Sequence, residues 1–243
     1  YQGQADAMQA LADKDPKQAL KYLDSAVKYQ PGEGQFWELR GHAWDMLNNP
    51  TNAEKAYSTA IAKNPDYFSH YLARGVLRFK QGQKAAAGKD LENSQKRLPT
   101  PVASLYLGNI SQANGDKESA ITYYREAAQT EGNIGQQAGD KLASIEMNQA
   151  PNRYILNKLT LDSSGYLLLS VYNRTNIPAT GVVVQLTEMA SAYVTGPSAQ
   201  IAIGALSANT QKTVSTRIGP LKDETALSRY RAVVIAAKPV NPS

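Results

Sequence analysis

The strongest constraint on this chain is a repeat with a period of 34 residues in its first part. Helix-like stretches end at this spacing in three prolines, which are Pro31, Pro65 and Pro99. Glycines keep the same register, with one residue deleted before the last of them: Gly41, Gly75 and Gly108. Proline has no backbone N–H to continue a helix, so each proline predicts a helix end. A self-repeat of this length predicts a stack, because one copy cannot bury its own apolar stripe.

Other positions of the repeat carry small, aliphatic or aromatic side chains. In register lie Ala19, Ala53 and Ala87, then Leu23, Tyr57 and Leu91, then Ala26, Ala60 and Ser94. Trp37 and Tyr71 lie four residues before the first two glycines. The pattern resembles the tetratricopeptide repeat (TPR). This resemblance implies pairs of antiparallel helices, in which Gly41 and Ala53 allow close approach while Tyr57 and Trp44 fill the adjacent space.

The register divides this region into four repeats, and the resemblance implies that they form an all-α solenoid. Their ranges are 1–33, 34–67, 68–100 and 101–133. The first repeat departs from the pattern, because Ala7 stands at the glycine position and Gly3 at the tryptophan position. Helical spacing continues after the fourth repeat through Ala138, Leu142, Ile145 and Met147. We therefore expect a capping helix, and a solenoid domain over 1–150.

One ion pair follows from the register. Arg74 lies beside a repeat glycine on a first helix and Asp90 lies beside Leu91 on the second, so the two side chains should face each other. Arg40 has the same position in the second repeat, but Ala56 replaces the carboxylate there. The alternative is that both arginines only pack their stems on the helix surface, since exposed pairs contribute little stability.

The pattern changes to strand-like alternation in residues 151–243, which we assign to an all-β sandwich. The expected strands are RYILNKLTL, YLLLSVYN, GVVVQLTE, AQIAIGAL, QKTVSTRI and RYRAVVIAA. Within the third, Val182, Val184 and Leu186 should share one face. The order of these motifs resembles the small immunoglobulin-like sandwiches of bacterial envelope proteins. The Asn173-Arg174-Thr175 triplet is expected to form a plain turn.

No catalytic, metal or cofactor motif occurs in the sequence. There is no cysteine, and the two histidines, His42 and His70, lack HExxH spacing. No serine elbow or phosphate loop is present, so we expect neither enzymatic activity nor a cofactor. The net charge of +5 comes from singly scattered basic residues of the second part, which argues against a nucleic-acid partner. No apolar run is long enough to span a membrane.

The remaining candidate site is the concave face of the solenoid, which in TPR proteins is lined by the first helix of each repeat. Carried over by register, the partner-binding residues are Met8, His42, Asp45, Met46, Val76, Phe79, Tyr106, Asn109 and Gln112. The carboxylate clamp of the family is not expected, because its positions hold residues such as Gln4, Met8, Leu39, Ser69 and Ala73. The surface instead suits an amphipathic helix or an apolar extended segment.

Three functional hypotheses follow. The first is a non-catalytic scaffold that binds a protein or peptide partner in the groove, unless the chain's own β-domain packs there. The second is the accessory region of a bacterial envelope zinc metalloprotease, whose architecture this chain resembles. It fits our expectation of further sequence ahead of Tyr1, because the chain does not begin with methionine. The third is a self-associating adaptor. We expect the periplasm or envelope rather than the cytoplasm.

Overall fold

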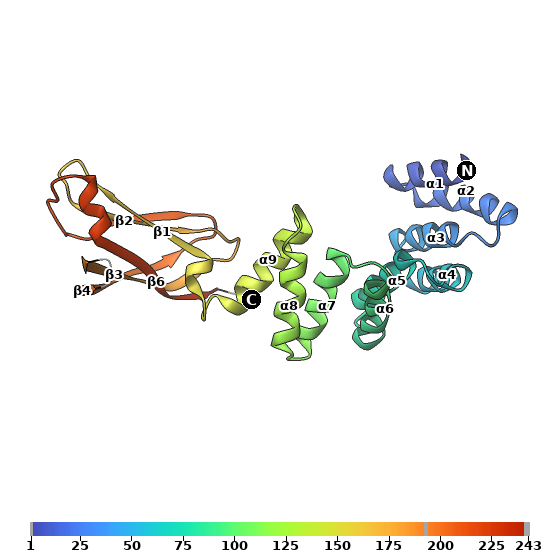
Figure 1. The fold of residues 1–243 in the computed structure, drawn as a ribbon. Helices are drawn as coiled ribbons and strands as arrows, with labels where there is room; N and C mark the ends of the chain where they lie inside the picture. Colours follow the sequence, from blue (N-terminus) through green and yellow to red (C-terminus); the bar gives the residue numbers. More distant parts are fainter. Residues whose placement is uncertain (1, 192–193, 241–243) are drawn as a thin grey trace. The chain divides into compact units, whose positions relative to one another are not determined.

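The computed structural model describes residues 2–191 and 194–240, and its contacts divide the chain into two compact domains, 1–135 and 136–243. The first domain consists of antiparallel helix pairs, one for each predicted repeat (Figure 1). The pairs are α1 (Gln2–Ala12) with α2 (Pro16–Tyr29), α3 (Gly34–Met46) with α4 (Pro50–Lys63), α5 (Phe68–Lys80) with α6 (Lys84–Arg97), and α7 (Pro101–Ala113) with α8 (Lys117–Ala127).

Prolines lie at the ends of the second helix in several repeats. Helices α2, α4 and α6 stop two residues before Pro31, Pro65 and Pro99, as the register predicts. A further proline occupies the first turn of α2 and α4, where its missing N–H costs no helical hydrogen bond. The residues before these prolines, Asp15 and Asn49, accept hydrogen bonds from backbone N–H groups two positions beyond the prolines and so cap the helices. The connections between helices are therefore defined by local chemistry.

The second, third and fourth helix pairs each have a close contact between a glycine and a large side chain, as the resemblance implied. A Cβ atom added at Gly41 would lie 2.3 Å from Cε1 of Tyr57, and one added at Gly108 would lie 2.6 Å from Cε1 of Tyr124. Both tyrosine side chains are almost fully buried. Glycine at these positions therefore sets the distance between the two helices of a repeat.

Two glycine-to-alanine changes should have opposite effects on stability. Gly41→Ala should destabilise the solenoid by about 2 kcal/mol, because the added methyl overlaps the Tyr57 ring. Gly88→Ala on α6 should stabilise it by about 0.5–1 kcal/mol, because the nearest atom is 3.9 Å away and alanine favours the helix. Urea unfolding followed by helical circular dichroism measures both. Equal shifts for the two variants would contradict the packing argument.

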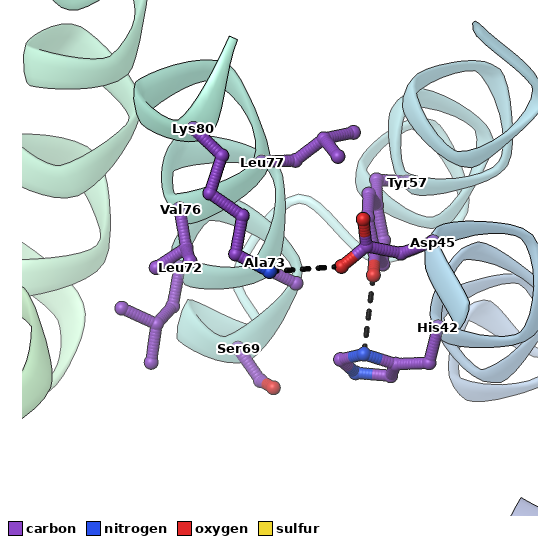
Figure 2. A pocket seen from close by; sticks show the side chains of 9 residues that line it. All are labelled: His42, Asp45, Tyr57, Ser69, Leu72, Ala73, Val76, Leu77 and Lys80. Carbon is purple, nitrogen blue, oxygen red and sulfur yellow. Dashed lines mark hydrogen bonds and ion pairs between the residues drawn. The ribbon is translucent and has the colours of Figure 1, made fainter. Parts of the chain in front are cut away.

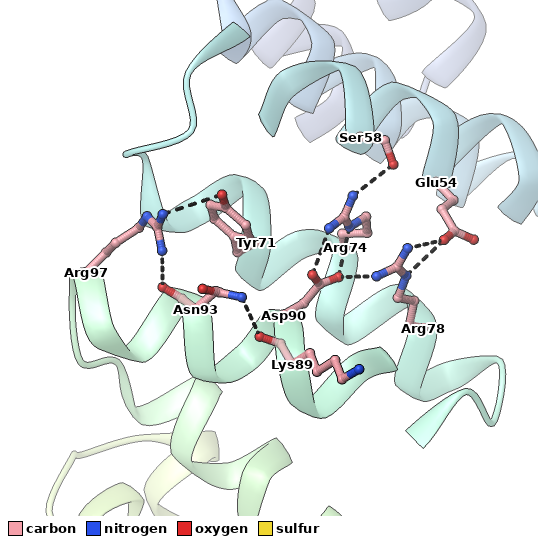
Figure 3. Close-up of polar contacts among 9 residues, drawn as sticks. All are labelled: Glu54, Ser58, Tyr71, Arg74, Arg78, Lys89, Asp90, Asn93 and Arg97. Carbon is pink, nitrogen blue, oxygen red and sulfur yellow. Dashed lines mark hydrogen bonds and ion pairs between the residues drawn. The ribbon is translucent and has the colours of Figure 1, made fainter. Parts of the chain in front are cut away.

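The predicted pair between Arg74 and Asp90 forms, and a second arginine joins it (Figure 3). Arg74 donates from Nε and Nη2 to the two carboxylate oxygens of Asp90, both at 2.8 Å. Arg78 donates from Nη1 to Asp90 at 2.8 Å and also contacts Glu54 of the preceding repeat at 2.6 Å. This ion cluster, formed by Arg74, Arg78, Asp90 and Glu54, therefore joins the second and third repeats.

Arg40 is also paired, although its own repeat offers no carboxylate. Its guanidinium contacts Asp24 on α2 of the preceding repeat. Arg74, one period later, correspondingly donates to the Ser58 hydroxyl at 3.0 Å. The prediction considered partners only within one repeat and so did not include Asp24.

The first helices of successive repeats form a continuous row. Helix α1 contacts α3, α3 contacts α5, and α5 contacts α7. We call the surface along this row the groove face. It corresponds to the surface that the sequence analysis selected for partner binding.

The second domain contains most of α9 (Asn133–Glu146), which begins just before the domain boundary, and two antiparallel three-stranded sheets. Their strands are β1 (Ile155–Leu161), β2 (Leu167–Asn173), β3 (Ala179–Ser191), β4 (Val194–Leu206), β5 (Gln211–Ser215) and β6 (Tyr230–Pro239). Two short 3-10 helices, η1 (Pro151–Arg153) and η2 (Glu224–Arg229), precede β1 and β6. One sheet has the order β1-β2-β5 and the other β4-β3-β6. All six expected strands are present.

A single core lies between the two sheets. Val182, Val184 and Leu186 of β3 are buried, as their alternation predicted. Leu169 and Val171 of β2 belong to the same core. Hydrophobic side chains from both sheets thus exclude water from one shared layer, which makes the domain a sandwich.

Asn173 begins a tight turn and is fully buried. Its amide donates a hydrogen bond to the Ile177 carbonyl at 2.8 Å, and its side-chain oxygen accepts from the Thr175 hydroxyl at 2.9 Å. The triplet is therefore part of the β2–β3 connection, as expected.

The contacts place the boundary between domains earlier than the sequence pattern does. The second domain begins at Gln136 rather than after residue 150. Ala143 and Met147, from α9 and just after it, are fully buried in the core of the sandwich. The helical period continues into a segment that packs with strands, and periodicity alone does not reveal this. A capping role for α9 stays a prediction.

Candidate functional site

A pocket of about 210 Å³ opens between α3 and α5 on the groove face (Figure 2). Three predicted site residues, His42, Asp45 and Val76, contribute to its lining. The other lining residues are Tyr57, Ser69, Leu72, Ala73, Leu77 and Lys80. The pocket thus combines an aliphatic wall from α5 with polar groups from both helices.

The polar side of the pocket is centred on His42 and Tyr57. The Tyr57 hydroxyl lies 3.1 Å from Nδ1 of His42, and the two rings meet edge to face. Burial, and after it the carboxylates of Asp45 and Glu38, raises the pKa of Tyr57. Because the phenol stays protonated, it can donate to Nδ1. The other ring nitrogen of His42 faces Glu38 Oε1 at 3.5 Å.

Glu38 lies behind the pocket and binds the next repeat. Its carboxylate accepts a hydrogen bond from the Ser69 hydroxyl at 2.6 Å and contacts Nδ1 of His70, which is fully buried. Burial acts to raise the pKa of Glu38, but hydrogen bonds from His42, His70 and Ser69 outweigh it and lower the pKa to about 2. Glu38 is therefore ionised at neutral pH and holds α3 against α5.

An ion pair crosses the open side of the pocket. Lys80 Nζ lies 3.0 Å from Asp45 Oδ2, and the two side chains are 54% and 32% exposed. Both groups can therefore exchange this contact for one to a ligand at little cost. Together with Leu72 and Val76, they suit a segment that carries an apolar side chain next to a polar or charged one.

Phe79 and Tyr106 pack within the solenoid to a greater extent than the site prediction assumed. Their ring centroids are 5.1 Å apart in an edge-to-face pair that joins α5 to α7. Both rings also pack against a core cluster that includes Leu91 and Leu107. Each remains partly accessible on the groove face, so a contact with a partner stays a prediction.

The other predicted residues divide into two groups. Asn109 and Gln112 lie within hydrogen-bond distance of the Tyr124 hydroxyl, at 2.8 Å and 2.7 Å. Met8 and Met46 are 54% and 45% exposed. The methionines and Gln112 are therefore the most accessible of the nine predicted residues, while Asn109 is partly covered.

Sequence reasoning placed Ser69 at a carboxylate-clamp position but did not select it for partner binding, and it missed Lys80 in the pocket and Glu38 behind it. Lys80 has the same register position as Met46, so the period itself placed it on this face. Glu38 and Ser69 are 31 residues apart and meet only because successive repeats stack. Nothing in the sequence of one repeat indicates this contact.

Neither a metal site nor a membrane span is found in the described part of the chain. No group of three or more His, Cys, Asp or Glu side chains there could hold a metal ion. Within residues 2–191 and 194–240, every helix is too short or too polar to cross a bilayer.

Comparison with known families agrees with the helix-pair geometry. The family model of the tetratricopeptide repeat matches three overlapping segments, residues 5–68, 42–100 and 72–134. The chain belongs to the tetratricopeptide repeat family. TPR domains mediate protein–protein interactions, so the family supports a scaffold role without naming a partner.

Curated relatives share the TPR part. The human protein SGT1 homolog is 28% identical over 87 residues, which are 36% of this chain and 24% of that protein. The small glutamine-rich tetratricopeptide repeat-containing protein 2 of Saccharomyces cerevisiae is 27% identical over 141 residues, 58% of this chain and 38% of that protein. The match thus spans less than two fifths of either relative.

Solved structures show the same fold for the TPR part of the chain. Pseudomonas aeruginosa pilF aligns with a TM-score of 0.53 at 15% identity, covering 58% of this chain and 64% of that one. MamA from Desulfovibrio magneticus aligns with a TM-score of 0.52 at 17% identity, covering 60% of this chain and 82% of that one. These similarities support the TPR solenoid.

Proposed function

We propose that this chain is a non-catalytic scaffold that binds an amphipathic helix or an extended apolar segment of a partner protein on the groove face. The α3–α5 pocket carries the proposal, because aliphatic and exchangeable charged groups meet there on the face that TPR domains present. Exposed Met46 extends this surface. Methionine adapts its flexible side chain to varied apolar partners.

Photocrosslinking tests where the partner lies. A photoreactive phenylalanine analogue placed at Met46 or Gln112 samples the groove face, and one at exposed Lys55 on α4 is the matched control. We expect adducts with the same partner from both groove positions and none from Lys55. Adducts only within the chain, or equal adducts from all three positions, would overturn the proposal.

Charge reversal in the pocket should weaken binding. Lys80→Glu places a second carboxylate beside Asp45, so the affinity for the crosslinked partner should fall about tenfold, which corresponds to about 1.4 kcal/mol. Stability should change little, because the lost pair is exposed. Lys55→Glu is the control and should bind as the wild type does. Isothermal calorimetry measures the affinities, and equal values for both variants would contradict the role of the pocket.

The second domain supports a finer proposal, that of an immunoglobulin-like sandwich. In the immunoglobulin type of order, strands A, B and E share one sheet, while C, C′ and F belong to the other. The orders β1-β2-β5 and β4-β3-β6 agree with this scheme when the six strands are lettered A, B, C, C′, E and F. An experimental structure of residues 136–243 would test it.

The proposed location and the metalloprotease alternative rest on architecture. We propose a place in the bacterial periplasm or envelope, which cell fractionation tests. If the chain is the accessory region of an envelope zinc metalloprotease, the part of its gene that precedes the codon for Tyr1 must encode an HExxH helix. Sequencing that part of the gene decides between the two, because an HExxH segment there supports the metalloprotease alternative over the free-standing scaffold.

A further inference from the structure

The first repeat lacks an aromatic ring that the second and third repeats share. Gly3 stands one period before Trp37, and Trp37 stands one period before Tyr71. Tyr29 has the register position that Arg97 holds in the third repeat. The intact repeats therefore show what the first repeat is missing.

In the third repeat the ring lies beside the end of the second helix. The Arg97 guanidinium lies over the Tyr71 ring, 4.3 Å from its centroid (Figure 3). It also donates a hydrogen bond to the Pro65 carbonyl at 2.9 Å. In the second repeat, the Trp37 indole N–H donates to the carbonyl of Pro31, which lies one period before Pro65, at 3.4 Å. Both rings thus lie next to the proline loop that precedes their repeat.

The equivalent space in the first repeat is an open pocket of about 370 Å³. Its lining consists of Gly3, Gln4, Tyr22, Ser25, Ala26, Tyr29, Gln30 and Phe36. The Tyr29 side chain, which has no ring to cover, is 87% exposed. A Cβ added at Gly3 would meet its nearest atoms only at 3.8 Å and 3.9 Å, so a side chain there would have room.

The lining determines which ligand fits. Tyr22, Tyr29 and Phe36 offer aromatic surface, and Gln4 and Gln30 can hydrogen-bond a ring N–H or O–H. None of the lining residues is charged, so an ion would gain no partner there. Aromatic groups gain from edge-to-face and offset contacts with such walls.

We propose that this pocket binds a tryptophan or tyrosine side chain from a segment of a partner protein. The incoming ring occupies the place that Trp37 and Tyr71 occupy in their own repeats, and Tyr29 covers it as Arg97 covers Tyr71. The site is separate from the α3–α5 pocket, because the two share no lining residue. It therefore goes beyond the groove-face proposal and can be tested independently.

Filling the pocket from within provides the main test. Gly3→Trp supplies the missing ring, and Gly3→Ala is the matched control, because it raises helix propensity without filling the space. The probe is N-acetyl-tryptophanamide, titrated while the NMR resonances of Ala26 and Tyr29 are followed. Wild type and Gly3→Ala should bind the probe, and Gly3→Trp should bind it at least about tenfold more weakly. Gly3→Trp should also melt about 3 °C above Gly3→Ala.

Tyr29→Ala keeps the test valid if Gly3→Trp does not fold. Because Tyr29 is 87% exposed, its removal should leave the melting temperature unchanged while the probe affinity falls several-fold. Tyr1→Ala tests whether the chain's own Tyr1, the aromatic residue nearest to Gly3 in the sequence, competes with the probe for the pocket. Failure of the wild type to bind the probe, equal binding by Gly3→Trp, or binding that appears only in Tyr1→Ala would overturn the proposal.

Discussion

Asp90→Ala should destabilise the solenoid by about 3 kcal/mol, because it leaves two partly buried arginines without their shared carboxylate. The Asp90 side chain is 4% exposed, and those of Arg74 and Arg78 are 16% and 20% exposed. Arg78 keeps Glu54 and Arg74 keeps the Ser58 hydroxyl, so the loss should lie at the lower end of that expected for a broken buried pair. Urea unfolding measures the change.

Asp24→Ala is the matched control for this experiment. Asp24 pairs with Arg40 in a comparable contact between helices, but its side chain is 57% exposed. An exposed pair contributes about 0–1 kcal/mol, so this variant should remain close to the wild type. A loss at Asp90 no larger than the loss at Asp24 would show that burial does not strengthen the ion cluster.

Acid should destabilise the wild type through Glu38 in particular. The pKa of Glu38 is lowered from 4.5 to about 2 in the folded protein, so its contribution is complete above about pH 4.5 and is lost as the pH falls toward 2. The shift corresponds to about 3 kcal/mol. Glu38→Gln should therefore be less stable than the wild type at pH 7. Its stability should also fall less than that of the wild type between pH 5 and pH 3, because it lacks the carboxylate whose pKa is shifted.

Denaturant unfolding at a series of pH values measures this effect. Glu92→Gln, which removes an exposed carboxylate from α6, should retain the wild-type dependence on pH. If Glu38→Gln followed the wild-type curve, the contacts of Glu38 with Ser69 and His70 would not stabilise the junction of the second and third repeats.

Much of the architecture could be predicted from the sequence, because geometry within one repeat depends on local spacing. The resemblance to the TPR implied that Tyr57 fills the space beside Gly41, and the register placed Arg74 opposite Asp90, since both contacts join the two helices of one pair. Alternation likewise placed Val182 and Val184 in the sandwich core. These contacts depend on residues whose separation along the chain determines their relation in space.

Contacts between repeats were predictable only in part, as the candidate site shows. His42, Asp45 and Val76 were selected by register and do line one pocket. Phe79 and Tyr106 were selected by the same rule, but they pack against each other across α5 and α7. The register identifies the face of a helix, whereas the angle between stacked repeats decides which side chains on that face cover one another.

By itself, the sequence determined the helix pairs, the strands and the side chains that lie on the groove face, because these follow from local periods and proline positions. The tertiary structure alone decided that Glu54 pairs with Arg78, and Asp24 with Arg40, across repeats. It also decided that Ala143 and Met147 join the sandwich core and that the space beside Gly3 is an open pocket. The physical reason is that each of these features requires side chains distant in sequence to share one volume, and only the packing of helices and strands brings them together.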